Sequence, residues 1–246
     1  MFYFMIGIGL IFAYINGMHD GGTVVATTIS SRLISPGRAV FIAGIANFLG
    51  AIALGTAVAY TISENIIDIS PVLAGKPDVC YTFVAAAFVG SLVWNVFTWI
   101  VKLPSSASHS MIGSMIGSGI AAYGFAYIEW YAIFIKVILA MLISPLVGFL
   151  FGYLFLKLQN RLLKNATIVW NKRIMILHKL SSFFLAFSYG SNDSQKVMGL
   201  IAIGLAGFYS ADIIIPLWLI LACSIALAVG TITGGYNMIK TVGMDI

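Results

Sequence analysis

The sequence predicts an all-α protein, a polytopic transmembrane helical bundle. Hydrophobic residues make up 61% of the 246 positions and charged residues only 9%, whereas a soluble domain carries about 25% charged residues. The chain has room for roughly seven or eight apolar segments of about 20 residues, the length that crosses a bilayer as a helix. We therefore expect an integral, multi-pass protein, located in the plasma (inner) membrane.

Two of the apolar stretches are interrupted near their middle by polar residues. The stretch 2–31 is apolar except around Gly17–Asp20, and neither half alone is long enough to span a bilayer. The stretch 174–208 is divided in the same way at Gly190–Asp193. We therefore predict that both are broken helices.

The charges between the apolar segments predict an orientation. Loops 61–79 and 124–130 carry mainly acidic residues, whereas the linker after residue 156 is basic. Six of the thirteen basic residues fall in or beside that linker, within residues 157–179: Lys157, Arg161, Lys164, Lys172, Arg173 and Lys179. Because cytoplasmic loops collect Lys and Arg, the linker should be cytoplasmic. The N-terminus is then outside, and five crossings separate it from the linker.

The sequence also contains an internal repeat. A shift of 173 residues places Gly17–Gly21 on Gly190–Ser194 and the apolar stretch 38–61 on 211–234. An odd number of crossings before the linker gives the second copy inverted topology. Inverted repeats with broken helices are the build of many secondary transporters, whose substrate lies near the midplane.

These observations divide the chain into three parts. A polar break at Leu103–Ser110 has no counterpart, because the same shift would place it beyond the last residue. The second repeat is therefore expected to be incomplete. The predicted parts are residues 1–157 as the first transmembrane repeat, 158–173 as the basic cytoplasmic linker and 174–246 as the partial second repeat.

Asp20 and Asp193 are the first candidate site residues. A charge within a membrane segment costs at least about 2.5–3.5 kcal/mol, so such a residue faces a cavity, a partner or an ion. Either aspartate could instead cap the helix that follows its break. We favour a site, because a helix start inside the membrane also attracts anions. Lys196 could pair with either carboxylate or offer its charge to an anion.

The break at Leu103–Ser110 supplies a third group of candidates. Pro104 should end the preceding helix, because proline has no N–H to donate within a helix. The serines that follow can cap the next helix and leave free N–H and hydroxyl donors, which suit an oxyanion of the size of phosphate. His109 could donate to that anion or hydrogen-bond to the backbone in the core.

Four blocks of residues, spread along the whole chain, resemble the signatures of the inorganic phosphate transporter (PiT) family. They are Asn16–Asp20 with Ala26–Thr27, Pro104–Gly113, Ser188–Gly199 and Gly230–Gly243. The chain is similar to a C-terminally short member or a fragment of that family. The resemblance implies a symporter in which Na⁺ or H⁺ drives the uptake of inorganic phosphate.

From the resemblance and the residues together we expect two sets of ligands. The anion would be held by Ser105, Ser106, Ser108, His109, Gly21, Thr23, Ser194 and Gln195. The coupling cation, Na⁺ or H⁺, would be held by Asp20, Asn192, Asp193 and Asn16. Phosphate and two carboxylates repel one another, so a bound cation would make their binding mutually dependent.

Several other functions are disfavoured by the sequence. The basic residues lie between membrane segments and show no nucleic-acid-binding motif, and no P-loop pattern indicates an ATPase. We expect no enzyme activity, no cofactor, and no metal beyond Na⁺ at Asp20 and Asp193. The expected partners are inorganic phosphate and the lipid bilayer, with a second copy of the chain as a candidate. Sulfate or another tetrahedral anion, and a truncated protein that does not transport, remain alternatives.

Overall fold

A computed structural model gives the architecture. It describes residues 1–31, 33–68, 76–101, 103, 105–168, 170–209 and 213–243, with the side chains of residues 23, 63–65, 99 and 235–243 left aside. All regular elements in these ranges are helices, which confirms the all-α prediction. Five of the helices are long and apolar enough to cross a membrane, as expected for a multi-pass protein.

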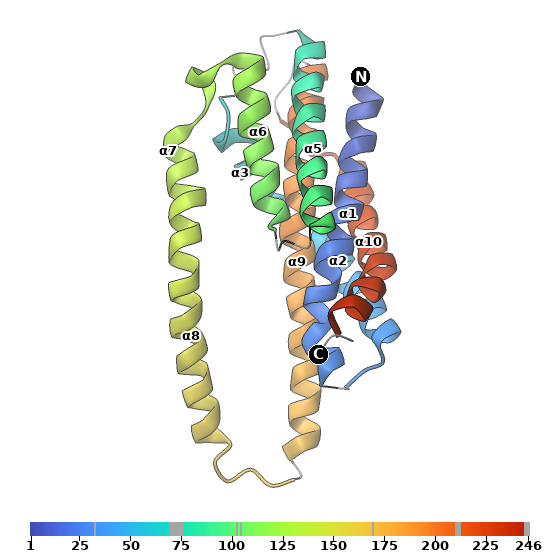
Figure 1. Cartoon of the computed structure of the whole chain (residues 1–246), viewed down its shortest axis with the longest axis vertical. Helices are drawn as coiled ribbons and strands as arrows, with labels where there is room; N and C mark the ends of the chain where they lie inside the picture. Colours follow the sequence, from blue (N-terminus) through green and yellow to red (C-terminus); the bar gives the residue numbers. More distant parts are fainter. Residues whose placement is uncertain are drawn as a thin grey trace.

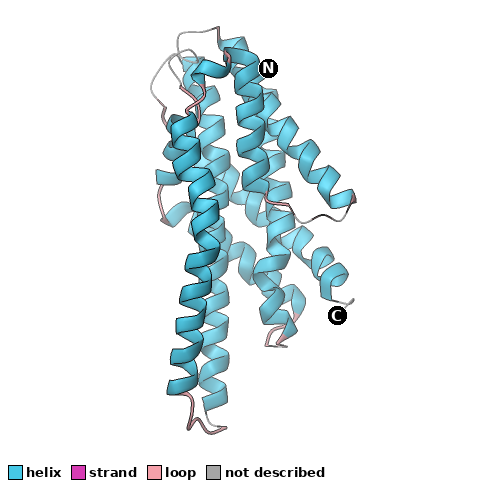
Figure 2. Ribbon diagram, turned by 60° about the vertical axis from the view of Figure 1, so that its left-hand side comes forward, coloured by secondary structure: helices cyan, strands magenta, loops and turns pink. Residues whose placement is uncertain are grey.

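The helices are connected in the order shown in Figure 1. The α-helices are α1 (Phe2–Ser30), α2 (Pro36–Ala53), α3 (Ala57–Asn65), α5 (Pro77–Ile100), α6 (Ala107–Tyr123), α7 (Trp130–Ile133), α8 (Ala140–Leu162), α9 (Trp170–Tyr209) and α10 (Leu217–Gly243). A 3₁₀ turn, Phe125–Tyr127, precedes α7, and a π-helix, Phe134–Leu139, joins α7 to α8. The long helices lie roughly along one common axis (Figure 2).

The helices that correspond in the two repeats run in opposite directions. In Figure 1, α1 runs from the N-terminal end of the bundle toward the other end, and α9 runs back the opposite way. The helices α2 and α10 are likewise opposed. The linker between α8 and α9 lies at the opposite end of the molecule from the N-terminus, as an odd number of crossings requires. The inverted-topology prediction is therefore confirmed.

Glycines set the two closest helix crossings. At each of four glycines a Cβ would run into a backbone carbonyl oxygen of the facing helix, so only glycine permits the approach. Helices α1 and α10 meet in this way, and so do α9 and α2. The four contacts are Gly17 with Leu227, Gly230 with Tyr14, Gly190 with Asn47, and Gly50 with Phe187.

These contacts correct the register of the repeat. Gly17 and Gly190 occupy equivalent crossings and are 173 residues apart, as predicted, but the equivalent pair Gly50 and Gly230 is 180 residues apart. The shift of 173 for the stretch 38–61 is therefore wrong by seven residues. Seven residues are about two helical turns, so the offset keeps the same helix face toward its partner. Helix α9 absorbs most of the difference, because it continues to Tyr209, six residues beyond the equivalent of Ser30.

The predicted breaks in α1 and α9 are wrong. Both helices run without interruption across Gly17–Asp20 and Gly190–Asp193. The glycines at these positions permit close packing between helices and do not interrupt the backbone hydrogen bonds. The aspartates consequently lie in mid-helix and cap neither segment. Tertiary packing outweighs the local preference of Gly, Ser and Asn for non-helical conformations.

The bundle does contain a broken helix, but at another place. Helix α2 ends at Ala53 and α3 begins at Ala57, and between them Gly55 has a φ of +74°. This backbone conformation is unfavourable for residues with a Cβ, so glycine is the residue that fits. The break therefore lies at Leu54–Thr56, a position that the sequence analysis did not single out.

Helices α5 and α6 form a hairpin whose turn lies at mid-height of the bundle (Figure 1). Helix α5 starts and α6 ends at the same end of the molecule. The hairpin therefore returns the chain to the side it came from, and the number of membrane crossings before the linker stays odd. Helix α5 packs on α1 through Phe88, whose ring centroid is 5.6 Å from that of Phe12. The turn of the hairpin lies beside the middle of α9, where the site is found.

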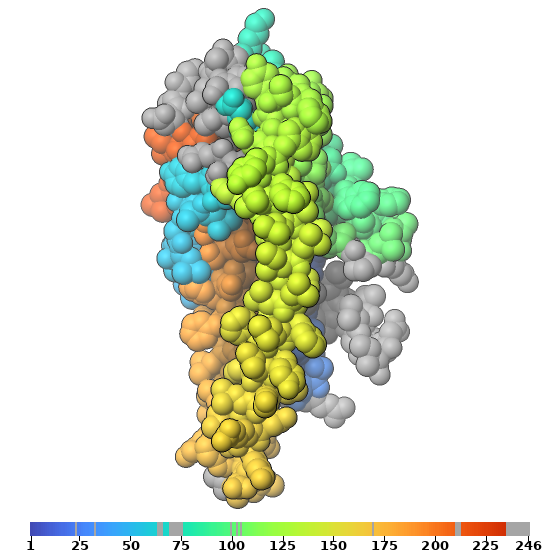
Figure 3. Space-filling model, turned by 90° about the vertical axis from the view of Figure 1, so that its left-hand side faces the viewer, coloured from blue at the N-terminus to red at the C-terminus, as the bar shows by residue number. Residues whose placement is uncertain are grey.

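Helix α9 is the centre of the bundle and α8 is at its edge. Most residues of α9 between Gly190 and Gly207 are buried, and they join one core with residues of α1, α3, α5, α6 and α10. Every residue of α8, in contrast, is exposed. Figure 3 shows α8 running along one face of the molecule.

Candidate functional site

An ion pair on α9 meets the turn of the α5–α6 hairpin. The ammonium group of Lys196 lies 2.8 Å from the carboxylate of Asp193, one helical turn away. The same ammonium donates a hydrogen bond to the hydroxyl of Ser108, at 2.5 Å. The Lys196 and Asp193 side chains are only 13% and 7% exposed. The pair therefore connects the predicted polar segment around Asp193 to the predicted polar segment around Ser108.

Asp20 belongs to the same cluster. From α1, its carboxyl group interacts electrostatically with Asp193 and with Lys196. The predicted convergence of the two aspartates is thus found, although both lie in unbroken helices. With all three groups ionised, two carboxylates and one ammonium carry a formal charge of −1. Such a trio attracts one further cation.

The hairpin turn also carries a hollow lined by several polar residues, which we call the polar hollow. Ser106 caps α6 by accepting the His109 backbone N–H, at 3.4 Å. The hollow has a volume of about 620 Å³, and five of its lining residues are polar. The lining consists of Gly90, Trp94, Ser105, Ser106, His109, Ser110, Gly113 and Ser114. Hydroxyls beside a helix start suit an oxyanion. Pro104 itself lies outside the described residues.

A row of buried polar residues on α5 supports the hairpin turn. The hydroxyl of Thr98 lies 2.8 Å from that of Ser105. Asn95 accepts a hydrogen bond from the Ser110 hydroxyl at 3.2 Å, and Ser91 lies 2.7 Å from the same hydroxyl. Ser91, Asn95 and Thr98 are each at most 3% exposed. The turn is therefore fixed to α5 by hydrogen bonds between side chains.

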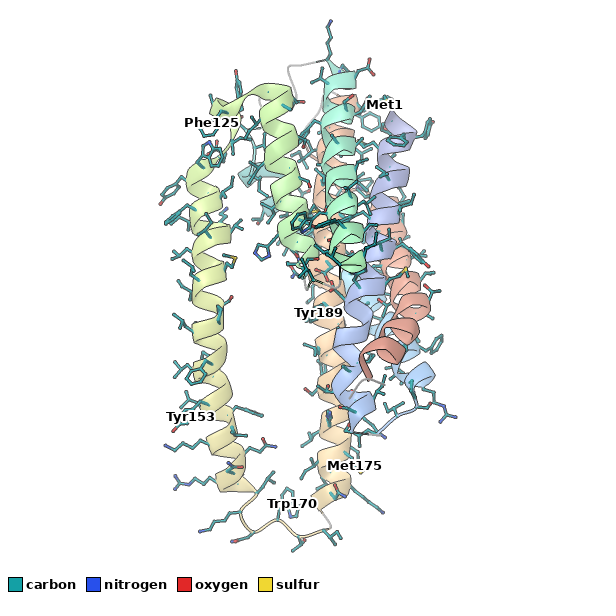
Figure 4. The ribbon with its side chains drawn as sticks, in the orientation of Figure 1. Met1, Phe125, Tyr153, Trp170, Met175 and Tyr189 are labelled. Carbon is teal, nitrogen blue, oxygen red and sulfur yellow. The ribbon has the colours of Figure 1, made fainter. Side chains whose placement is uncertain are left out.

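This row of residues was not predicted from the sequence. The signal was present, because Ser91, Asn95 and Thr98 follow one another at intervals of four and three residues in an apolar segment. That spacing places them on one helix face. Figure 4 shows the side chains of the hairpin turn gathered beside α9 at the level of Tyr189.

Two of the residues predicted to bind the anion have other partners. The Gln195 side chain accepts the Val58 N–H at 2.9 Å and donates to Ser191 at 2.9 Å. It therefore caps the first turn of α3, directly after the break at Gly55. Gly21 packs against α10, where an added Cβ would lie 3.0 Å from the methyl group of Thr231.

The other residues predicted to bind the anion or the cation lie in different environments. Asn16 is 4% exposed, and its Oδ1 atom accepts no hydrogen bond from the residues that the structure describes. Ser194 is fully buried, with its hydroxyl 3.9 Å from the sulfur of Met198. Asn192 is exposed, on a different face of α9 from Asp193. The Thr23 side chain lies outside the described part of the chain.

Comparison with known proteins identifies the family. The model of the phosphate transporter family matches residues 16–246. The chain belongs to this family. A family match that begins at Asn16 and continues to the last residue includes Asp20, the hairpin turn, Asp193 and Lys196. The site described above is therefore built from residues within the matched region.

Several relatives in the phosphate transporter family are similar over nearly the whole chain. Each of the three named here is called a probable low-affinity inorganic phosphate transporter. The Rhizobium meliloti protein is 34% identical and the Bacillus subtilis protein 35% identical, with 98% and 96% of this chain covered. A Mycobacterium tuberculosis (strain H37Rv) protein is 34% identical over 96% of the chain. The chain spans 71%, 70% and 56% of these relatives, respectively.

A solved structure shares the fold. It is described as the sodium-dependent phosphate transporter, and it matches with a TM-score of 0.81 at 20% sequence identity. The match covers all of this chain and 78% of the other. At this identity the likeness establishes the arrangement of the helices, which agrees with the bundle described above.

Proposed function

We propose that this chain transports inorganic phosphate across the membrane by symport with Na⁺ or H⁺. The observation that carries the proposal is the link from Asp193 through Lys196 to Ser108, which connects a carboxylate cluster to the hairpin turn that carries the polar hollow. Membership of the phosphate transporter family and the names of the relatives support phosphate as the substrate. The sodium-dependent structural neighbour supports Na⁺ as the driver.

In this proposal the anion occupies the hollow at the start of α6. The hydroxyls of Ser105 and Ser106 and the imidazole of His109 border the hollow and can donate to phosphate oxygens. Ser108 holds the ammonium group of Lys196 at the same turn. A positive charge at a helix start is a favourable site for an oxyanion. We assign no catalytic step to these residues.

The coupling cation would be held by the carboxylates. Two like charges 4 Å apart repel by about 4 kcal/mol at an effective dielectric constant near 20. Phosphate therefore binds poorly beside Asp20 and Asp193 until one charge is neutralised. Na⁺ bound between the carboxylates, or a proton on one of them, removes this repulsion. Asn16 lies one helical turn before Asp20 on α1, and its Oδ1, which has no hydrogen-bond partner among the described residues, would supply a further ligand to Na⁺. Anion and cation then bind together, which is the thermodynamic requirement for symport.

The test is phosphate uptake by the purified chain in liposomes. We expect uptake of labelled phosphate against its gradient when an inward Na⁺ or proton gradient is imposed. Asp193→Asn should lower the uptake and weaken its dependence on the cation. Wild-type uptake by this variant with unchanged cation dependence would contradict the role of Asp193. Uptake that stops once phosphate has equilibrated across the membrane, whatever cation gradient is imposed, would indicate a channel.

Sulfate is the second candidate substrate, because it is also tetrahedral and accepts the same hydrogen bonds. Unlabelled sulfate should compete weakly with labelled phosphate if the site prefers phosphate. Equal competition would assign the chain to a general tetrahedral-anion permease. A chain that gains no thermal stability from either anion or from Na⁺, and shows no uptake, would be a protein that does not transport.

A further inference from the structure

The linker end of the molecule differs from the rest in its exposure. All of α8 is exposed, and every residue of α9 from Trp170 to Leu185 is exposed or only half-buried. Figures 1 and 3 show these two segments extending together at the end of the molecule opposite the N-terminus. Apolar side chains such as Leu154 on α8 and Leu180 on α9 are about half exposed, at 49% each.

The length of these helices carries their ends out of the hydrocarbon. The stretch Trp130–Leu162 has 33 residues, and 33 residues of helix are about 50 Å long. A bilayer core is about 30 Å thick, or about 20 helical residues. If Trp130 marks one interface, Lys157 and Arg161 lie beyond the other. The end of α8, the linker and the start of α9 therefore lie at the level of lipid headgroups.

This end carries charge of one sign. Between Glu129 and Asp193 the sequence contains neither aspartate nor glutamate. Six basic residues are concentrated in residues 157–179, which we call the basic end, and all six side chains are exposed. They are Lys157, Arg161, Lys164, Lys172, Arg173 and Lys179. Their charges are consequently not neutralised by acidic residues of the same segment.

An aromatic residue anchors the same region. The guanidinium of Arg173 lies 5.2 Å from the centre of the Trp170 ring, a cation–π contact. Trp and Tyr are enriched where a membrane meets water. Tyr153 lies on α8 one turn before Lys157, and Figure 4 labels Tyr153 and Trp170 on the two sides of the linker. Apolar surface, aromatic rings and positive charges thus follow one another toward the end of the molecule.

We propose that the basic end binds anionic phospholipid headgroups of the cytoplasmic leaflet, with the acyl chains along the exposed faces of α8 and α9. A Lys or Arg near an anionic membrane contributes about 1 kcal/mol, so a cluster of six favours anionic over zwitterionic lipid. Charge complementarity and the apolar surface directly above the charges both match a lipid. A soluble acidic partner would leave that apolar surface uncovered. The proposal is independent of phosphate transport.

The experiment measures thermal unfolding of the purified chain in detergent, with added phosphatidylglycerol or phosphatidylcholine at equal mole fraction. We expect phosphatidylglycerol to raise the melting temperature several degrees more than phosphatidylcholine does, and 0.5 M NaCl to remove most of the difference. A double variant, Lys157→Gln with Arg161→Gln, should lose a large part of the response to phosphatidylglycerol.

The control removes an exposed charge at the opposite end of the molecule, in Lys76→Gln, and should respond as the wild type does. Equal stabilisation of the wild type by both lipids, or a full response of the Lys157/Arg161 variant, would overturn the proposal. A response of the wild type that salt does not weaken would also overturn it, and that measurement does not depend on the folding of any variant.

Discussion

The ammonium group of Lys196 lies 2.5 Å from the hydroxyl oxygen of Ser108, although 88 residues separate them in the sequence. This contact joins α9, which carries Asp193, to the first turn of α6, which borders the polar hollow. One side chain therefore contacts both the carboxylate cluster and the hairpin turn. A change at Lys196 should affect both at once.

Replacing Lys196 with methionine should abolish most phosphate uptake. The substitution leaves Asp193 buried without its partner, and breaking a buried ion pair in this way costs about 3–5 kcal/mol. We expect uptake below one tenth of wild type and a lower melting temperature. Lys76→Met, which changes an exposed lysine directly before α5, should leave both unchanged. Wild-type uptake by Lys196→Met would exclude Lys196 from the site.

Thr98→Val should weaken phosphate binding without unfolding the protein. Valine has nearly the shape of threonine but cannot hydrogen-bond to Ser105, which is 2.8 Å from the Thr98 hydroxyl. A hydrogen bond contributes about 0.5–1.5 kcal/mol, so the KM for phosphate should rise roughly two- to tenfold. Thr98→Ser should restore the wild-type KM.

Thr82→Val is the control on the same helix, because the Thr82 hydroxyl bonds only to the local carbonyl of Asp78 among the described residues, and it is exposed. An unchanged KM in Thr98→Val would show that the α5 row does not position the turn for binding.

Gly190→Ala should destabilise the bundle. The added methyl group would run into the backbone of Asn47 on α2, and overpacking of this kind costs about 1–3 kcal/mol. We expect a clear fall in the melting temperature. Gly148→Ala is the control, because a Cβ at Gly148 on the exposed α8 meets nothing within 4 Å. Equal melting temperatures for the two variants would show that α2 and α9 do not cross at this glycine.

Gln195→Leu should separate a structural role from a binding role. The leucine leaves the Val58 N–H without the acceptor that Gln195 provides at 2.9 Å. A buried donor without a partner costs about 1–3 kcal/mol, so the melting temperature should fall. The KM for phosphate should stay near the wild-type value, because Gln195 contacts α3. A large rise in KM at an unchanged melting temperature would instead make Gln195 an anion ligand.

The sequence predicted the fold class and the approach of Asp20 to Asp193 because both depend on strong signals. A charge in an apolar segment must be compensated, and two such charges in a repeat are brought together by its symmetry. The structure differs from the prediction where the local conformational preference of a residue and the packing of helices conflict. Gly17 and Gly190 were interpreted as breaks, but each allows a neighbouring helix to approach.

The real break at Gly55 could not be distinguished from the sequence. The chain has 25 glycines, and one with positive φ looks the same as one that packs against a helix. The seven-residue offset of the second repeat was hidden for a similar reason. Both shifts place apolar residues on apolar residues, so only the contacts at Gly50 and Gly230 decide between them.

The uninterrupted α9 has a mechanical consequence. It is held near its middle, where Phe187 and Gly190 touch α2. Its half from Gly190 to Gly207 is embedded in the core, so the exposed half from Trp170 to Leu185 projects from a fixed base. Movement of the core around the buried half would therefore carry the exposed half at the linker end with it. A helix broken at Gly190 would bend at that point and transmit little of this motion.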